Sequence, residues 1–94
     1  MAFLLCHLKC EDYTKWRAAF EEHNELRQSA GSKGAHIFQS ASDPNDVWLT
    51  LTFEDQASAQ GMMGRDDVRE AIRKSGVIGE VQVFPIEDAG RTPA

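Results

Sequence analysis

The chain has 94 residues, enough for one domain with a modest core, and we expect no second domain. Lys and Arg number 10 and Asp and Glu number 15, giving a formal charge of -5, and the basic residues are scattered, so neither nucleic acid nor a membrane surface is expected as a partner. No apolar run approaches the roughly 20 residues of a membrane span, and the first residues lack the basic start of a signal peptide, so we expect a cytoplasmic protein.

A first strand is predicted over residues 2–9, an apolar run too short for a capped helix. Both faces of this strand are largely apolar, which predicts burial on both sides. Cys6 and Cys10, the only cysteines, would point the same way about 13 Å apart, too far for a disulfide. His7 points to the other face, so no metal site is predicted, and we interpret both cysteines as small core residues.

A helix is predicted from Asp12, which can cap it, to Gly31, which can end it in the left-handed conformation. Aromatic and apolar residues recur every three or four positions in this segment and form one stripe, which ends in an imidazole and a guanidinium. Large aromatic side chains favour a core, whereas the two polar groups need a partner or water. The stripe therefore predicts a helix that lies on a sheet and ends at a half-polar cavity. Its members are Tyr13, Trp16, Ala19, Phe20, His23, Leu26, Arg27 and Ala30.

A β-hairpin is predicted next, with strands over residues 35–41 and 47–54. Residues 42–46 between them, Ser-Asp-Pro-Asn-Asp, form a strong turn signal. The second strand alternates apolar and semi-polar residues, which indicates one core face and one face that carries the large aromatic Trp48.

A second helical region is predicted to start at Asp55, which can cap its first turn. Gly61 and Gly64 should break this helix around Met62 and Met63. The two methionines form either an adaptable lid over a pocket or ordinary gap filling in the core.

A short helix, a strand and a tail complete the chain. The helix is predicted to start at Asp66 or Asp67 and to end at Gly76. The last strand is predicted over residues 79–86, and residues 87–94 lack any periodicity and read as a loose tail.

The predicted order is strand, helix, strand, strand, broken helix, strand, which is the α+β, ferredoxin-like βαββαβ arrangement: a four-stranded antiparallel sheet with helices on one face. We therefore expect a single domain over residues 1–86. The second sheet face would be open, and an apolar patch of that size is seldom left to water, so a symmetric homodimer through the open faces is expected. If Leu4 and Leu49 face the core, the open face carries Phe3, Leu5, His7, Trp48 and Thr50.

Several short stretches together carry a family resemblance. They are Asp12-Tyr13-x-x-Trp16-x-x-x-Phe20 with Arg27, Ala30-Gly31 with Gly34, Asp43-Pro44-Asn45, and Gly76-Val77-Ile78-Gly79. These residues resemble the dimeric α/β-barrel superfamily and, within it, short stand-alone proteins of the antibiotic-biosynthesis-monooxygenase-like and cyclase groups. The resemblance covers residues 4–86 and is specific for the fold rather than for an activity, since such scaffolds host many functions.

The resemblance implies a homodimer closed by two sheets, with an apolar pocket between the helices and the sheet of each subunit. Relatives in the superfamily include cofactor-free oxygenases of anthrones and quinols, polyketide cyclases, isomerases, and haem-binding or haem-degrading enzymes. The haem branches take a histidine ligand from the later helical region. This chain has no histidine after His36, so the resemblance gives no support to a haem site.

An oxygenase or cyclase of this kind needs an apolar pocket, a base, and a donor for the resulting oxyanion. Histidine suits the base because its unperturbed pKa is about 6.5. His23 is the first candidate, with Arg27 as the anion partner and Trp16 and Phe20 as walls; the alternative places His23 and Arg27 at the rim of the domain. His7 is the second candidate base, and its alternative is a satisfied core or interface residue.

The other candidate site residues are open to two interpretations each. Trp48 is either a pocket wall or, as we favour, an anchor of the dimer interface. Met62 and Met63 are candidate substrate-binding residues if they form a lid. His36 is interpreted as structural. No phosphate loop, dinucleotide fingerprint, nucleophile elbow or zinc spacing occurs, so no flavin, nicotinamide or metal cofactor is predicted.

These observations predict a small homodimer that acts on a small aromatic or polyketide-like molecule, as a cofactor-free monooxygenase or a polyketide cyclase with a histidine base. The alternative is a non-catalytic small-molecule-binding or accessory protein on the same scaffold, which would keep an unaltered ligand through purification. A third hypothesis is an interaction module whose open sheet meets a different protein, and it predicts a monomer when the protein is purified alone.

Overall fold

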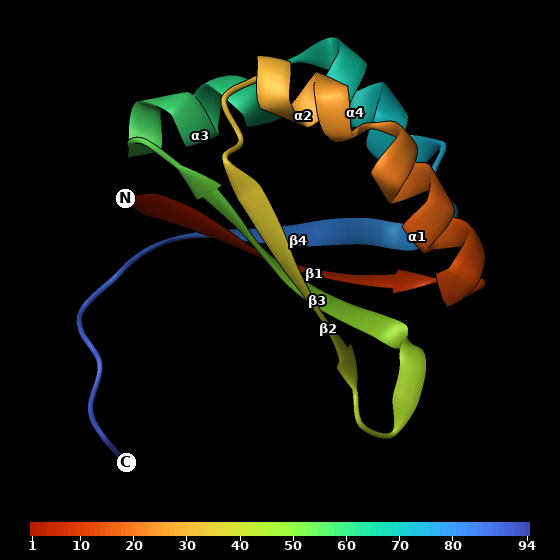
Figure 1. Ribbon diagram of the computed structural model, residues 1–94. Coiled ribbons are helices and arrows are strands. Elements are labelled where there is room, and N and C mark those ends of the chain that lie inside the picture. Colours follow the sequence, from red (N-terminus) through yellow and green to blue (C-terminus); the bar gives the residue numbers. More distant parts are fainter.

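The computed structural model describes residues 1–94 as one sheet covered by helices (Figure 1). The strands run in the order β2 (Gly34–Ser40), β3 (Asp43–Phe53), β1 (Ala2–Cys10) and β4 (Val77–Glu87), and all three neighbouring pairs are antiparallel. All four helices lie over one face of the sheet, and no helix covers the other face (Figure 1). The predicted α+β, ferredoxin-like arrangement is confirmed. In chain order the elements are β1 (Ala2–Cys10), α1 (Tyr13–Glu22), α2 (Asn24–Ser29), β2 (Gly34–Ser40), β3 (Asp43–Phe53), α3 (Gln56–Met63), α4 (Asp66–Arg73) and β4 (Val77–Glu87).

The core lies between the sheet and the helices, because alternate residues of the two central strands point to that side. This confirms the predicted core face of β3, and it settles the side of β1, whose two apolar faces left the choice open: Leu4 faces the core. The interpretation of both cysteines as small core residues is also confirmed, since both are buried free thiols. Helix residues of α1, α3 and α4 close the core from above. The buried cluster consists of Leu4, Cys6, Leu8, Cys10, Trp16, Val47, Leu49, Leu51, Phe53, Ala59, Met62 and Val68.

The predicted first helix is divided in two at His23, and this break was not predicted. The backbone N–H of His23 donates to the carbonyl of Phe20 at 3.3 Å, while its ring nitrogen Nδ1 bonds the carbonyl of Ala19 at 2.8 Å. A side chain that takes the carbonyl four residues earlier competes with the helical ladder, so α1 ends there. Gly31, with φ of 105°, then ends the second segment in the left-handed conformation, as predicted.

The break in the second helical region lies later than predicted. Asp55 caps α3 by accepting a hydrogen bond from the Ser58 N–H at 2.8 Å, as expected. The prediction that Gly61 breaks the helix is wrong, because α3 continues through it to Met63 and ends at the cap residue Gly64. A glycine inside a helix lowers stability by about 1 kcal/mol without forbidding the conformation.

The predicted turn at residues 42–46 is also corrected, because β3 already begins at Asp43. The turn residues Ala41 and Ser42 precede it, and the hairpin register shifts between Gln39 and Ser40. Asn45 does not turn the chain. Its Oδ1 accepts a hydrogen bond from the Tyr13 N–H at 2.9 Å, which ties the start of β3 to the start of α1.

The last strand is longer at both ends than the predicted 79–86 and forms an edge of the sheet, where Pro85 is tolerated. Residues 88–94 form no helix or strand and lead away from the sheet (Figure 1). None of the helices combines the length and the hydrophobicity that a membrane-spanning helix requires.

Candidate functional site

An apolar cavity lies between the helices and the covered face of the sheet. Its volume is about 80 Å³, and 16 of its 19 lining residues are hydrophobic. Residues of β1, β3 and β4 form its floor, and all four helices contribute to its walls. Pockets of this composition, with a few polar groups among apolar walls, are typical of small-molecule sites.

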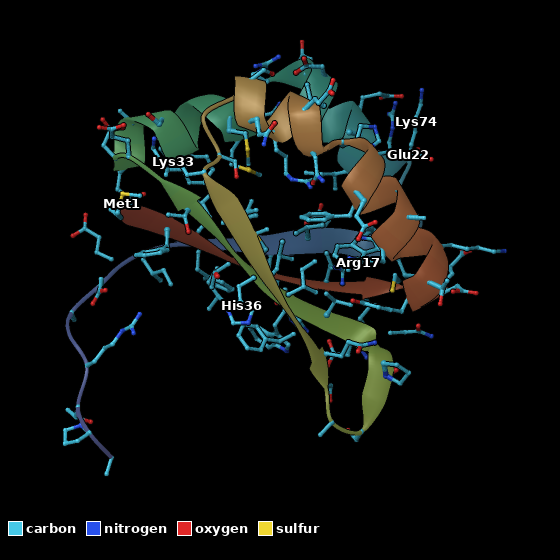
Figure 2. All side chains as sticks on the ribbon, in the orientation of Figure 1. Met1, Arg17, Glu22, Lys33, His36 and Lys74 are labelled. Carbon is cyan, nitrogen blue, oxygen red and sulfur yellow. The ribbon has the colours of Figure 1, made fainter.

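The structure brings six of the predicted site residues together in this cavity and separates two others from them. His7 and Trp48 pair across β1 and β3 on the open face, on the other side of the sheet. Register places His36 on that face as well, opposite Thr50, and Figure 2 shows it beyond the sheet, away from the helices. The six that line the cavity are Trp16, Phe20, His23, Arg27, Met62 and Met63.

The aromatic wall of the cavity comes from α1. Trp16 is only 2% exposed, and its ring stacks on that of Phe20 with centroids 4.9 Å apart and an interplanar angle of 27°. Tyr13 extends the row on the other side of Trp16, at a centroid distance of 5.9 Å. Tyr13 does not line the cavity, but Trp16 and Phe20 do, and their rings give it an aromatic wall that can pack against an aromatic ligand.

His23 lies half-buried in the lining, at the junction of α1 and α2. Its Nδ1 is 2.8 Å from the carbonyl oxygen of Ala19. A carbonyl only accepts hydrogen bonds, so Nδ1 donates and the neutral ring keeps the lone pair on Nε2. Nε2 has no hydrogen-bond partner within the chain, and this leaves a base available at the cavity.

Arg27 is the only cation in the cavity lining. Its guanidinium carbon lies 3.5 Å from the centre of the Phe20 ring, and one of its terminal nitrogens donates to Oδ1 of Asn24. Burial lowers the pKa of Arg27 to about 10, so the side chain stays charged at neutral pH. It forms no salt bridge.

The other polar groups of the lining are poorly suited to take part in a reaction. The Ser75 hydroxyl donates to the carbonyl of Ile72 at 2.6 Å. Burial raises the pKa of the Cys6 thiol to about 11, so it is protonated and a poor nucleophile at neutral pH. No three His, Cys, Asp or Glu side chains lie close enough together to hold a metal ion.

His7 on the open face has a different environment from His23. Its Nδ1 lies 3.0 Å from Oε1 of Gln82 and its Nε2 lies 2.5 Å from Oδ1 of Asp46, and its ring stacks on Trp48 at 3.9 Å. The hydrogen bonds to Gln82 and then to Asp46 raise its pKa. With acceptors at both nitrogens, the protonated ring is favoured, and it has no lone pair to offer as a base.

The open face is also rich in exposed apolar side chains. Phe38 is 48% exposed and Phe84 44% exposed, although both are large and apolar. They lie on opposite edge strands, and partly buried apolar residues of β1 lie between them. Single exposed apolar residues are ordinary, but a contiguous patch indicates a binding surface. Its apolar members are Phe3, Leu5, Phe38, Trp48, Ile78, Phe84 and Ile86.

Sequence reasoning missed the partners of the candidate residues. Asn24 precedes Arg27 by three residues on a helix, so its contact could have been found from spacing. Asp46 and Gln82 reach His7 from two different strands, and this contact depends on the register of both strand pairs. No local pattern in the sequence carries that register.

Comparison with solved structures shows a shared fold over nearly the whole chain. SnoaB, described as a cofactor-independent oxygenase from Streptomyces nogalater, superposes in a point-mutant form with a TM-score of 0.78 at 5% identity, covering 99% of this chain and 97% of that chain. A Bordetella bronchiseptica protein provisionally assigned as an antibiotic biosynthesis monooxygenase gives a TM-score of 0.78 at 14% identity, covering 94% and 96%. Identities this low show similarity of fold alone.

Sequence comparison is more specific. No curated protein matches the chain. The model of the family described as antibiotic biosynthesis monooxygenase matches residues 7–74, a span that runs from β1 to the end of α4 and includes the six candidate residues of the cavity. By this match, the chain belongs to the antibiotic biosynthesis monooxygenase family.

Proposed function

We propose that the protein is a cofactor-independent monooxygenase that oxidises a small aromatic or polyketide-like molecule in the cavity, with His23 as the base. The observation that carries this proposal is the hydrogen bond from Nδ1 of His23 to the Ala19 carbonyl, which leaves the lone pair of Nε2 unused in an apolar cavity. Family membership and the fold shared with SnoaB, itself described as a cofactor-independent oxygenase, support the reaction class.

The proposed reaction begins when Nε2 of His23 takes a proton from a phenol or from an activated CH₂ group of the substrate. The resulting anion is electron-rich and reacts with dioxygen directly. The balanced change converts CH₂ and O₂ into C=O and H₂O, so both substrate hydrogens leave as water and no external reductant is required. The protein's part is to bind the ring against Trp16 and Phe20, to accept the proton, and to exclude bulk water from the cavity.

We further propose that two copies pair through their open sheet faces. The apolar patch on that face includes side chains of all four strands, and burying it against a second copy removes it from water. His7 and Trp48 would then lie in the interface, which agrees with their stacking and with the full use of both His7 nitrogens.

The direct test is oxygen uptake with a panel of anthrones and hydroxynaphthalenes, beginning with 1,8-dihydroxy-9-anthrone. His23→Gln should lower kcat/KM by about 10²- to 10⁴-fold, the usual contribution of a general base. His7→Gln is the matched control, since it removes a histidine from the other face of the sheet and should leave the rate unchanged. Equal rates for wild type and His23→Gln would remove His23 as the base.

A polyketide cyclase is the second candidate, because aldol-type ring closure uses the same base in the same apolar cavity. Oxygen consumption separates the two reactions: a monooxygenase uses one O₂ for each product, whereas a cyclase releases water and uses none. Product mass by liquid chromatography and mass spectrometry distinguishes the added oxygen atom from the lost water.

A further inference from the structure

The charge of Arg27 is not balanced within the protein. The guanidinium is half-buried and forms no salt bridge, and its nearest partners are the neutral amide oxygen of Asn24 and the face of the Phe20 ring. Both contacts are favourable, but neither carries a full negative charge. Removing a cation from water without a counter-ion is costly, and the lowered pKa of Arg27 reflects that cost.

Three other arginines of the same chain do have a carboxylate partner. Arg17 is paired with Glu21 at 2.8 Å, Arg65 with Asp67 at 2.6 Å, and Arg73 with Glu70. Those three pairs lie on the outer surface of the helices, where the charges are partly exposed. In a chain with 15 acidic residues, three of the five other arginines are paired with a carboxylate, whereas the arginine at the cavity has none.

The cavity itself contains no negative group. Its three non-hydrophobic lining residues are His23, Arg27 and Ser75, and the Ser75 hydroxyl is already committed to the Ile72 carbonyl. A guanidinium has five N–H donors, and only the contact with Asn24 uses one of them within the protein. The cavity therefore combines apolar walls, one positive charge and several unused donors in a planar fork, which matches a carboxylate.

We propose that the ligand of this cavity is a small aromatic acid that binds as a mono-anion, with its carboxylate on Arg27 and its ring against Trp16 and Phe20. Arg27 follows His23 by one helical turn, so an acid group held at Arg27 places neighbouring ring positions towards His23. The inference rests on the cavity of the proposed function and specifies its substrate class, but it does not require turnover.

The test compares benzoate with benzamide, which have nearly the same shape and differ in charge. Binding is measured by isothermal titration calorimetry and by quenching of tryptophan fluorescence, since Trp16 lines the cavity. Wild type should bind benzoate about 10- to 100-fold more tightly than benzamide, the ratio expected for hydrogen bonds to a charged group. Arg27→Gln should bind both with the weaker affinity of benzamide, and Arg27→Lys should keep part of the preference.

Arg17→Gln is the matched control, because it removes a helix arginine that is paired with Glu21 and lies outside the cavity. It should keep the wild-type preference. Circular dichroism verifies that each variant is folded, and if Arg27→Gln is not folded, Arg27→Lys carries the test. Equal affinities of wild type for the two probes, no benzoate binding at millimolar concentration, or a full preference for benzoate in a folded Arg27→Gln protein each overturn the proposal.

The outcomes also separate this inference from the proposed reaction. If the protein consumes oxygen through His23 but shows no preference for benzoate, the aromatic-acid ligand is ruled out and the monooxygenase proposal stands. If the protein selects benzoate through Arg27 but oxidises no substrate, the anion site is supported and the proposed reaction is ruled out.

Discussion

The two faces of the sheet both carry apolar side chains, but their polar groups differ in whether they have hydrogen-bond partners. On the covered face, Nε2 of His23 has no partner and most donors of Arg27 are unused. On the open face, both nitrogens of His7 are bonded, to Gln82 and to Asp46. Unused hydrogen-bonding capacity beside a cavity is capacity that a ligand can use, whereas a satisfied group holds structure in place.

The comparison also shows why two histidines in one short chain have different prospects. Their residue type alone does not distinguish them. What separates them is the partner of each ring nitrogen, which only the three-dimensional structure supplies: His23 bonds a carbonyl within its own helix, and His7 bonds two other strands. The following changes break or sharpen this comparison, beginning with the largest expected effect.

Two phenylalanines give the sharpest contrast in stability between the faces. Phe53 is fully buried on the covered face, so Phe53→Ala should lower the free energy of unfolding by about 3–5 kcal/mol. Phe38→Ala, on the open face, should lower the free energy of unfolding by less than about 1 kcal/mol when measured at protein concentrations where the dimer dissociates. Urea unfolding followed by far-ultraviolet circular dichroism gives both values, and similar losses at the two sites would contradict the assignment of faces.

A charge placed on the open face tests the proposed dimer. Phe84→Asp introduces two carboxylates into the interface of a symmetric dimer, where each loses its hydration. The dissociation constant should rise by about 30-fold or more, as for loss of an interface residue worth at least 2 kcal/mol. Sedimentation velocity over a concentration series measures the change. Ala57→Asp, at an exposed position of α3, is the control and should leave the oligomeric state unchanged, and a wild type that is monomeric throughout would end the dimer proposal.

Filling the cavity separates its role in binding from its role in stability. Ala71 lines the cavity from α4, so Ala71→Leu adds side-chain volume where a ligand would lie. The free energy of unfolding should change by no more than about 1.5 kcal/mol, since a cavity tolerates added volume better than a close-packed core. Binding of benzoate should fall by about tenfold or more, which is 1.4 kcal/mol of affinity. Unchanged binding in calorimetry would place the ligand elsewhere.

The fold was largely predictable because periodicity is a local property of the sequence. Alternation over β3 predicted which of its residues face the core, whereas the two apolar faces of β1 left its core side open. The spacing of the predicted helical stripe placed Trp16, Phe20, His23 and Arg27 on one side, and the structure brings them to one cavity. The alternation of a strand and the apolar stripe of a helix can both be read without knowing which strand lies next to them. The predictions that follow from them therefore agree with the structure.

The predictions that failed concern competition between interactions. Gly61 is a poor helix former, but α3 continues through it because packing of neighbours such as Ala59 and Met62 outweighs its propensity. Asp43-Pro44-Asn45 has turn residues, but the Asn45 side chain bonds the start of α1 and the segment stays extended. The separation of His7 from His23 likewise depends on which sheet face is covered, and both faces of β1 are apolar in the sequence.

The smallest expected effect is the pH dependence contributed by the open face. Because hydrogen bonds to Gln82 and Asp46 raise the pKa of His7 in the folded state, the folded protein holds this proton more tightly than the unfolded chain, where the pKa is about 6.5. The stabilisation is therefore complete below about pH 6.5 and is lost as the pH rises through the folded-state pKa. It should amount to no more than about 1 kcal/mol, because both partners are partly exposed and water screens their charges.

Urea unfolding at a series of pH values measures the contribution of His7 to the free energy of unfolding. The Phe84→Asp background is preferred, so that dissociation of a dimer adds no pH dependence. His7→Gln should remove the fall in stability above about pH 6.5, and His36→Gln, which changes another histidine of the same face, should keep it. The same fall in His7→Gln as in wild type would show that the His7 bonds do not hold the proton. The open face would then lack the satisfied histidine that distinguishes it from the cavity, and His7 would again be as available for chemistry as His23.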